Sequence, residues 1–129
     1  MSTITTIDGT VHHIDDDSIV LVTGPFPNEP PNRSYVTGPA PDPLPVDENA
    51  AALVGRLHPT TPFGRLTRPN GTPVWFKGAA VSLVRPPIPT DVPPGETVGA
   101  VLYIAGHHQA VTESVTATLA EVNGHGGHL

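Results

Sequence analysis

The stretch LTRPNGT at residues 66–72 alternates apolar and polar side chains and then runs into an Asn-Gly pair. A related stretch, TTIDGT at residues 5–10, stands near the start of the chain with Asp-Gly in the same place. Both pairs accept the positive φ angles of a type I′ turn, so each stretch predicts a β-hairpin. The same signal therefore occurs once in each half of the chain.

The segments that follow the two hairpins are also similar. SIVLVT at residues 18–23 and AVSLVR at residues 80–85 are β-branched apolar runs of strand length, and both stop at prolines. A Pro-rich connection then leads to SYVTG at residues 34–38 and to LYIAG at residues 102–106. The aromatic residue, the β-branched residue and the glycine come in the same order, which aligns the two tyrosines.

Each half finishes with a segment of helical periodicity, at residues 46–57 and 111–122. Apolar side chains recur on one stripe of each segment. Asp47 and Thr112 stand where N-caps belong, and the Asn-Gly pair after the second segment is typical of a helix end. We therefore expect one short helix at the end of each half.

These recurrences predict a tandem duplication of a unit made of β-hairpin, strand, strand and helix. The expected units are residues 1–60, which are Pro-rich and degenerate, and residues 61–123, followed by a Gly/His tail at residues 124–129. We expect a β-dominated α+β fold in which the units pack about a pseudo-two-fold axis as one compact domain. The alternative is that two unrelated β-rich halves share turn chemistry by chance.

The second unit also resembles a known family. LTR-x-NG at residues 66–71, the apolar strand after it, Gly106 in a hairpin and VTESV at residues 111–115 before a helix are similar to the small FlbD-like proteins found beside flagellar genes. The resemblance covers somewhat under half of the chain. A Pro-rich insertion at residues 86–94 and the degenerate first copy depart from the family's pattern. The resemblance implies a small β-plus-helix fold without catalytic residues.

Composition narrows the class of protein. The chain has 129 residues with 17 Pro, 13 Gly and no Cys, and its formal net charge is −6. The lack of cysteine excludes disulfides and thiolate metal sites, and the negative charge argues against nucleic-acid binding. No apolar run approaches the about 18 residues of a membrane span, and the Met-Ser-Thr start does not have a signal-peptide pattern. We therefore expect a protein that stays inside its compartment or assembly, with no membrane partner.

The prolines cluster at residues 25–31, 39–45 and 86–94, where we expect ordered loops or straps. Prolines at alternate positions of residues 39–45 cannot donate to a β-ladder, so this segment is predicted to be an extended strap that replaces a hairpin of the second unit. A strap of this kind can lie across a neighbouring subunit. The proline candidates for partner contacts are Pro41, Pro43 and Pro87.

Seven histidines raise the hypothesis of a metal site, since three aspartates follow the pair His12-His13 closely. Adjacent histidines on a strand point to opposite faces, so exposed turn and tail histidines are the favoured interpretation. Asp15, Asp16 and Asp17 lack the glycine spacing of a calcium loop and are expected to be a turn of solvated carboxylates. No serine stands in a G-x-S-x-G elbow, and no phosphate-binding glycine motif is present. We therefore predict no catalytic residue, metal ion or cofactor.

Aromatic residues make up only 5% of the chain, which makes the Trp75-Phe76 pair conspicuous. The two side chains face opposite sides of their strand, so one fills the core while the other reaches solvent or a partner. The alternative is that the other repeat covers the opposite face. Trp75, Phe76 and Phe26, which lies in the first Pro-rich segment, are the aromatic candidates for a partner interface.

These features predict a non-enzymatic structural protein that acts through protein–protein contacts. Its cysteine-free, Pro-, Thr- and Val-rich composition of low charge resembles that of small head proteins of tailed bacteriophages, which implies a virion protein of the capsid-decoration or head-completion type. Its partners would be the major capsid protein or copies of itself in a homo-oligomer. Two alternatives are a bacterial accessory or regulatory binding module in the cytoplasm, as the FlbD-like resemblance implies, and a His-based metal enzyme.

Overall fold

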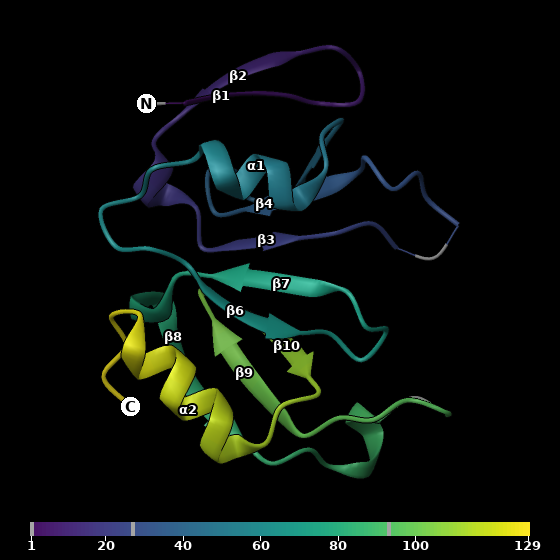
Figure 1. Cartoon of the computed structure of the whole chain (residues 1–129), viewed down its shortest axis with the longest axis vertical. Helices are drawn as coiled ribbons and strands as arrows, with labels where there is room; N and C mark the ends of the chain where they lie inside the picture. The colour runs from purple at the N-terminus through teal and green to yellow at the C-terminus, as the bar shows by residue number, and fades with distance from the viewer. Residues whose placement is uncertain (1, 27, 93) are drawn as a thin grey trace.

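The fold consists of two successive sets of strands, and one α-helix follows the last strand of each set (Figure 1). The computed structural model describes residues 2–26, 28–92 and 94–129. The first set contains β1 (Ser2–Thr5), β2 (Val11–Ile14), the 3-10 turn η1 (Asp16–Ser18), β3 (Leu21–Thr23), β4 (Ser34–Thr37), β5 (Leu44–Val46) and α1 (Ala50–Arg56). The second contains β6 (Gly64–Thr67), β7 (Pro73–Phe76), η2 (Gly78–Ala80), β8 (Val81–Arg85), η3 (Pro89–Asp91), β9 (Ala100–Ile104), β10 (His107–Val111) and α2 (Val115–Gly124). The expected β-dominated α+β class is confirmed.

The two predicted hairpins form, and their turns have the same geometry. β1 pairs with β2, and β6 pairs with β7, both antiparallel. In these turns φ is positive only at the glycines, +86° at Gly9 and +88° at Gly71, so the predicted type I′ turn is wrong. The side chains of Asp8 and Asn70 each accept the backbone N–H two residues further on at 3.0 Å. This Asx-turn holds the residue before each glycine in an ordinary conformation.

The two halves share one sheet. β7 of the second half pairs antiparallel with β3 of the first, and this ladder completes a five-stranded sheet in the order β5-β4-β3-β7-β6. A two-fold axis that placed β7 beside β3 would also place β2 beside β8. Among the described residues, however, β2 pairs only with β1, and β8 pairs only with β9. The halves therefore pair through β3 and β7 but not through the equivalent strands β8 and β2. The expected pseudo-two-fold arrangement does not form.

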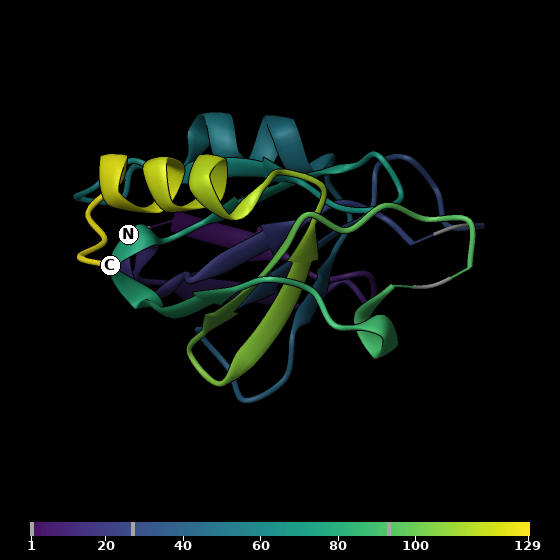
Figure 2. The same cartoon turned by 90° about the horizontal axis from the view of Figure 1, so that it is seen from below.

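Two apolar clusters form the core, one for each half. The first includes Val22 and Leu53, and the second includes Phe76 together with Leu21, which β3 contributes from the first half. Trp75 of the second half is half-buried and packs against the cluster of the first half. Both helices lie on the same side of the molecule (Figure 2). The β3–β7 ladder therefore exchanges side chains between the two cores.

Both helices begin later than the periodicity predicts. The N-caps are Asn49, whose side chain accepts two first-turn N–H groups at 3.0 and 3.3 Å, and Ser114, whose hydroxyl accepts one at 3.1 Å. The predicted caps, Asp47 and Thr112, instead directly follow β5 and β10, because the valine before each of them ends a strand. Those valines belong to the sheets and not to the helical stripes.

The predicted strap at residues 39–45 is wrong in part. Leu44–Val46 forms β5, which pairs with β4, so the first half keeps the hairpin that the second half has. Pro45 is tolerated because β5 is the edge strand of its sheet, and its carbonyl accepts the N–H of Ile7 at 3.1 Å. The remaining prolines of the segment lie in the β4–β5 loop.

The alignment of the two tyrosines is also wrong. Leu21 and Leu83 stand at the same distance from the glycine of their hairpin, and Leu21 lies opposite Thr37 while Leu83 lies opposite Tyr103. Tyr103 therefore takes the place of Thr37, and not that of Tyr35. A one-strand pattern of aromatic, β-branched residue and glycine fits equally well two residues out of register, because side chains on the same face recur at every second position.

The Gly/His tail is not a loose extension. α2 continues through Gly124, and the tail then folds back, with the N–H of Gly127 donating to the carbonyl of Val122 at 2.9 Å. The side chain of Asn123 hydrogen-bonds both the N–H and the carbonyl of Leu129 at 2.9 Å. Pro27 and Pro93, which belong to two of the predicted Pro-rich segments, lie outside the described residues.

A glycine in η2 lets the end of α2 approach closely. A Cβ at Gly78 would lie 2.5 Å from the carbonyl oxygen of His125 and 2.7 Å from that of Val122, so we expect Gly78→Ala to lower the free energy of unfolding by about 1–3 kcal/mol. Gly55→Ala, inside α1, is the control, because a Cβ there meets nothing within 4 Å, and it should raise stability by up to about 1 kcal/mol. Urea unfolding measures both, and equal effects would contradict the packing at η2.

Candidate functional site

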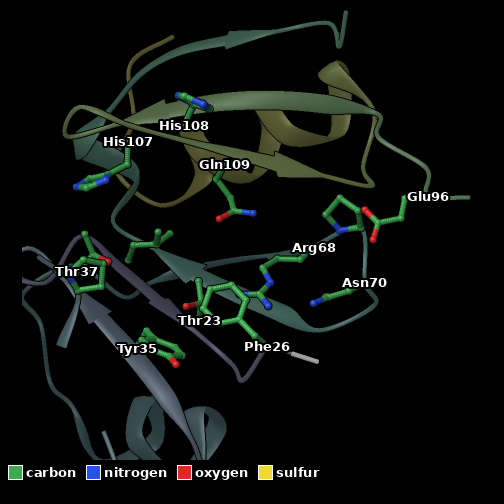
Figure 3. A pocket seen from close by; sticks show the side chains of 13 residues that line it. Thr23, Phe26, Tyr35, Thr37, Arg68, Asn70, Glu96, His107, His108 and Gln109 are labelled. Carbon is green, nitrogen blue, oxygen red and sulfur yellow. The ribbon is translucent and has the colours of Figure 1, made fainter. Parts of the chain in front are cut away.

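A cavity of about 660 Å³ lies at the junction of the two halves (Figure 3). One wall comes from the first half, with Thr23 of β3 and Tyr35 of β4, and the opposite wall includes His107 and Gln109 of β10. Arg68, from the β6–β7 turn, also lines it. The cavity therefore exists because β7 pairs with β3, which brings the second half over the outer face of β3 and β4.

Arg68 is the most unusual residue of this cavity. Its side chain is only 6% exposed, yet its Nη2 donates to the carbonyl of Pro25 at 3.3 Å and no salt bridge to a carboxylate forms among the described residues. Its guanidinium carbon lies 5.4 Å from the centre of the Phe26 ring. Burial lowers the pKa of Arg68, and the more distant charge of Glu29 opposes that shift. The wall thus presents a guanidinium with unused hydrogen-bond donors.

Glu29 forms no salt bridge with Arg68, because other groups bind its carboxylate. Its carboxylate accepts the N–H of Phe26 at 2.7 Å and the hydroxyl of Tyr35, and it forms a salt bridge with Arg33 at 3.1 Å. The Tyr35 hydroxyl, the Phe26 N–H and, more weakly, Arg33 hold the pKa of Glu29 below its ordinary value. The cavity can therefore accommodate an acidic or carbonyl-bearing group of a partner beside Arg68.

The structure brings together two of the predicted partner residues and separates the others. Phe26 is 54% exposed and lines the cavity together with Pro43. Phe76 is 1% exposed, so the prediction that it contacts a partner is wrong: the alternating strand turns it into the core. Trp75 is half-buried against the other half, as the alternative interpretation had it.

Pro41 and Pro87 lie apart from the cavity. Pro41 is exposed in the β4–β5 loop, and Pro87 is half-buried just after β8. The β8 strand and the β2 strand carry exposed apolar side chains that the sequence analysis did not single out, Leu83 at 43% and Val11 at 55% exposure. No signal in the sequence separates Leu83 from Leu21, which stands at the same distance from its hairpin glycine but is only 7% exposed.

The histidines do not converge. His12 and His13 lie on β2, whereas His107 and His108 lie on β10. In the part of the chain that the structure describes, no group of three or more histidine, aspartate or glutamate side chains is placed to hold a metal ion. The Nδ1 of His125 lies 2.8 Å from the carbonyl oxygen of Glu121 in the same helix end.

Two of the three aspartates at residues 15–17 bind the link between the halves. Asp15 caps η1 by accepting the N–H of Asp17 at 3.0 Å. Asp16 accepts the N–H of His58 at 2.7 Å, and Asp17 accepts both the N–H and the hydroxyl of Thr60, at 2.6 and 2.7 Å. Asp16 is only 7% exposed, so the expected turn of three solvated carboxylates is corrected. The cluster is structural, because it anchors residues 58–60 to the first half.

The electrostatics of the cluster agree with that role. The N–H and hydroxyl of Thr60 lower the pKa of Asp17, with burial opposing and Lys77 assisting. For Asp16, burial raises the pKa, but the N–H of His58 and the hydroxyl of Ser2 outweigh it, so the net shift is also downward. Both carboxylates are therefore held in their charged form by hydrogen bonds that exist only in the folded chain.

Comparison with known proteins adds no relative: no protein family, curated protein or solved structure matches this chain. No helix among residues 2–26, 28–92 and 94–129 is long and apolar enough to cross a membrane.

Acid should loosen the link between the halves. Since the pKa of Asp17 is lower in the folded chain than in the unfolded one, its contribution to stability is fully present above about pH 4 and is lost as the pH falls through the folded-state pKa. Asp17→Asn should therefore be less stable than the wild type at pH 7, and the difference should shrink below about pH 4. Urea midpoints across pH measure this, with Asp42→Asn in the exposed β4–β5 loop as the control. A difference that does not change with pH would contradict the assignment.

Proposed function

We propose that this protein is a structural subunit of a larger protein assembly and acts through its strand edges and Pro-rich loops. The observation that carries the proposal is that Val11 on β2 and Leu83 on β8 are exposed apolar side chains on strands with one ladder partner each in the described part of the chain. Monomeric proteins protect edge strands with charge, proline or a covering segment, because an open edge pairs with other chains. Apolar residues on open edges therefore support a role in association.

The loop surface supports the same role. Phe26, which is 54% exposed, lies over the guanidinium of Arg68 and 5.2 Å from the ring of Tyr35. An exposed aromatic ring held by two neighbours loses little conformational entropy when a partner covers it, which is the property of an interface anchor. The cavity beside it provides a concave complement for a partner side chain.

The particular assembly that we propose is a tailed-bacteriophage virion, in which the protein would be a capsid-decoration or head-completion protein. Its partners would be the major capsid protein or further copies of itself. The support is compositional: the chain is free of cysteine, low in charge and rich in proline. This part of the proposal is separable from the first, since another assembly could use the same edges.

A second candidate is a regulatory binding module, and the cavity at Arg68 favours it. A buried guanidinium with spare donors beside an open cavity is suited to one acidic group of a partner. Such a module would not be part of a particle. It would lie in the bacterial cytoplasm and bind its partner one-to-one, whereas an assembly subunit would be found in particles.

Copy number in purified particles tests the proposed function. We expect the protein to co-purify with native particles at a fixed number of copies per particle, measured by quantitative mass spectrometry against the major shell protein. Particles that lack the protein, together with a monomeric protein in the soluble fraction, would contradict the proposal and favour the regulatory module.

Replacing the exposed aromatic ring should weaken incorporation without unfolding the chain. We expect Phe26→Ser to lower occupancy in reconstituted particles by about tenfold, because loss of an aromatic anchor typically costs more than 1 kcal/mol of binding. Val92→Ser, at a residue that is 38% exposed outside the cavity, is the control and should bind as the wild type does. Equal occupancy of the two variants at equal thermal stability would exclude Phe26 as an anchor.

A further inference from the structure

The strands of each half follow one linear order. In the first half β2 pairs with β1, Thr6 just after β1 forms an isolated bridge with Val46 of β5, and β5, β4 and β3 follow as neighbours. In the second half β7, β6, β10, β9 and β8 follow in the same order. The junction between hairpin and meander is made by equivalent bonds: the N–H of Asp47 donates to Thr5 at 3.2 Å, and the N–H of Thr112 donates to Thr67 at 2.8 Å.

Side chains correspond along with the strands. The hairpin core residue Ile4 corresponds to Leu66, with exposures of 1% and 3%, and the helix caps Asn49 and Ser114 occupy the same place after the last strand. Leu21 corresponds to Leu83 in sequence, but the first is 7% and the second 43% exposed. The difference between equivalent leucines therefore marks a contact that one half makes and the other lacks.

That contact is the β3–β7 ladder. Leu21 lies opposite Phe76 and Val22 lies opposite Trp75, and the N–H of Lys77 extends the ladder by donating to Val20 at 2.9 Å. Through it Leu21 enters the apolar cluster of the second half. β3, which ends the spatial strand order of the first half, thus lies beside β7, which begins the spatial strand order of the second half.

The same two elements stand open at the opposite ends of the molecule. β2 is the equivalent of β7, and β8 is the equivalent of β3, and neither has a second ladder partner among the described residues. Figure 1 shows the β1–β2 hairpin at one end of the longest axis and the β8–β10 sheet toward the other. A groove of about 540 Å³ runs along β2, lined by His13, Ile14, Ser18 and Leu44 among others.

The groove is equivalent to the site in the second half that Leu21 occupies. Ile14 and Ser18 of the groove correspond to Phe76 and Ala80, which belong to or pack against the cluster that receives Leu21. The first half thus has an equivalent site, and no strand among the described residues occupies it. The exposed Leu83 of β8 is the equivalent of the residue that would do so.

We propose that β8 of one copy pairs antiparallel with β2 of a second copy and so repeats, between chains, the β3–β7 ladder within the chain. The register follows from the internal one: Leu83 lies opposite Ile14, and Val84 lies opposite His13. This inference deepens the proposed function, on which it rests, by naming a second copy of this chain as the partner of both edges.

The geometry of such a contact is heterologous, because two different surfaces meet. Each added copy leaves one β2 and one β8 open, so association continues until a ring closes or a filament grows. Both helices lie on the same side of the molecule, so a repeat of the internal relation keeps all helices of the assembly on one face (Figure 2). A symmetric dimer through β8 alone would use one edge twice and is a different arrangement.

Cysteine cross-linking between two variants tests the register, since the chain has no cysteine of its own. His13→Cys and Val84→Cys proteins of different tag length are mixed and oxidised, and we expect a disulfide heterodimer as the main product, because directly paired residues lie within disulfide reach. Thr3→Cys replaces His13→Cys as the matched control: Thr3 is exposed and paired with His13 on the same hairpin, but one strand further from the edge. Equal yields with the control, or a predominant Val84→Cys homodimer, would overturn the proposal.

The association itself is measured by sedimentation of the full chain without cysteines. Leu83→Glu should weaken self-association at least about tenfold, while Val92→Glu should not change it. If the wild type associates but Leu83→Glu has no effect, the β8–β2 contact is wrong and the assembly role stands on other surfaces. If the wild type stays monomeric and is also absent from purified particles, both the contact and the proposed function fail.

Discussion

The ladder between β3 and β7 is the interaction on which the rest of the structure depends. Without it, each half would be a small rolled sheet with one helix and an incomplete core. With it, Leu21 completes the second cluster, Trp75 covers the first, and five strands form one sheet. The cavity at Arg68 also exists only because this ladder places the second half over the outer face of β3 and β4.

Further contacts hold the halves in the relation that the ladder sets. Asp16 and Asp17 accept N–H groups from residues 58–60, and the Nζ of Lys77 donates to the carbonyl of Asp17 at 2.8 Å. These bonds fasten the link between the halves to η1, next to the start of β3. Asp16 and Asp17, which in the sequence suggest a metal site, instead accept hydrogen bonds from donors more than forty residues further along the chain.

The two proposals use different parts of one arrangement. The cavity and Phe26 lie where the halves meet, and the open edges β2 and β8 lie where the same kind of meeting would occur between chains. The internal contact joins β3 of the first half to β7 of the second half. It leaves their equivalents β8 and β2 each with one open edge in the described part of the chain, and these two edges, at opposite ends of the molecule, are complementary to each other. A two-fold contact would have satisfied both edges and left none open, which is why the one-sided pairing matters for function.

The sequence by itself determined where the two hairpin turns lie and that the fold is β-dominated, because Asp-Gly, Asn-Gly and alternating apolar residues act locally. It did not determine the turn type or the strand β5. It did not determine the helix starts at Asn49 and Ser114, since Val46 and Val111 serve a strand as well as a helical stripe. The burial of Phe76, the guanidinium of Arg68 beside Phe26, and the exposure of Leu83 were decided by tertiary structure alone. These three features depend on which strand lies beside β3 and β8. Local residue patterns do not show which distant strand will pair with a given strand.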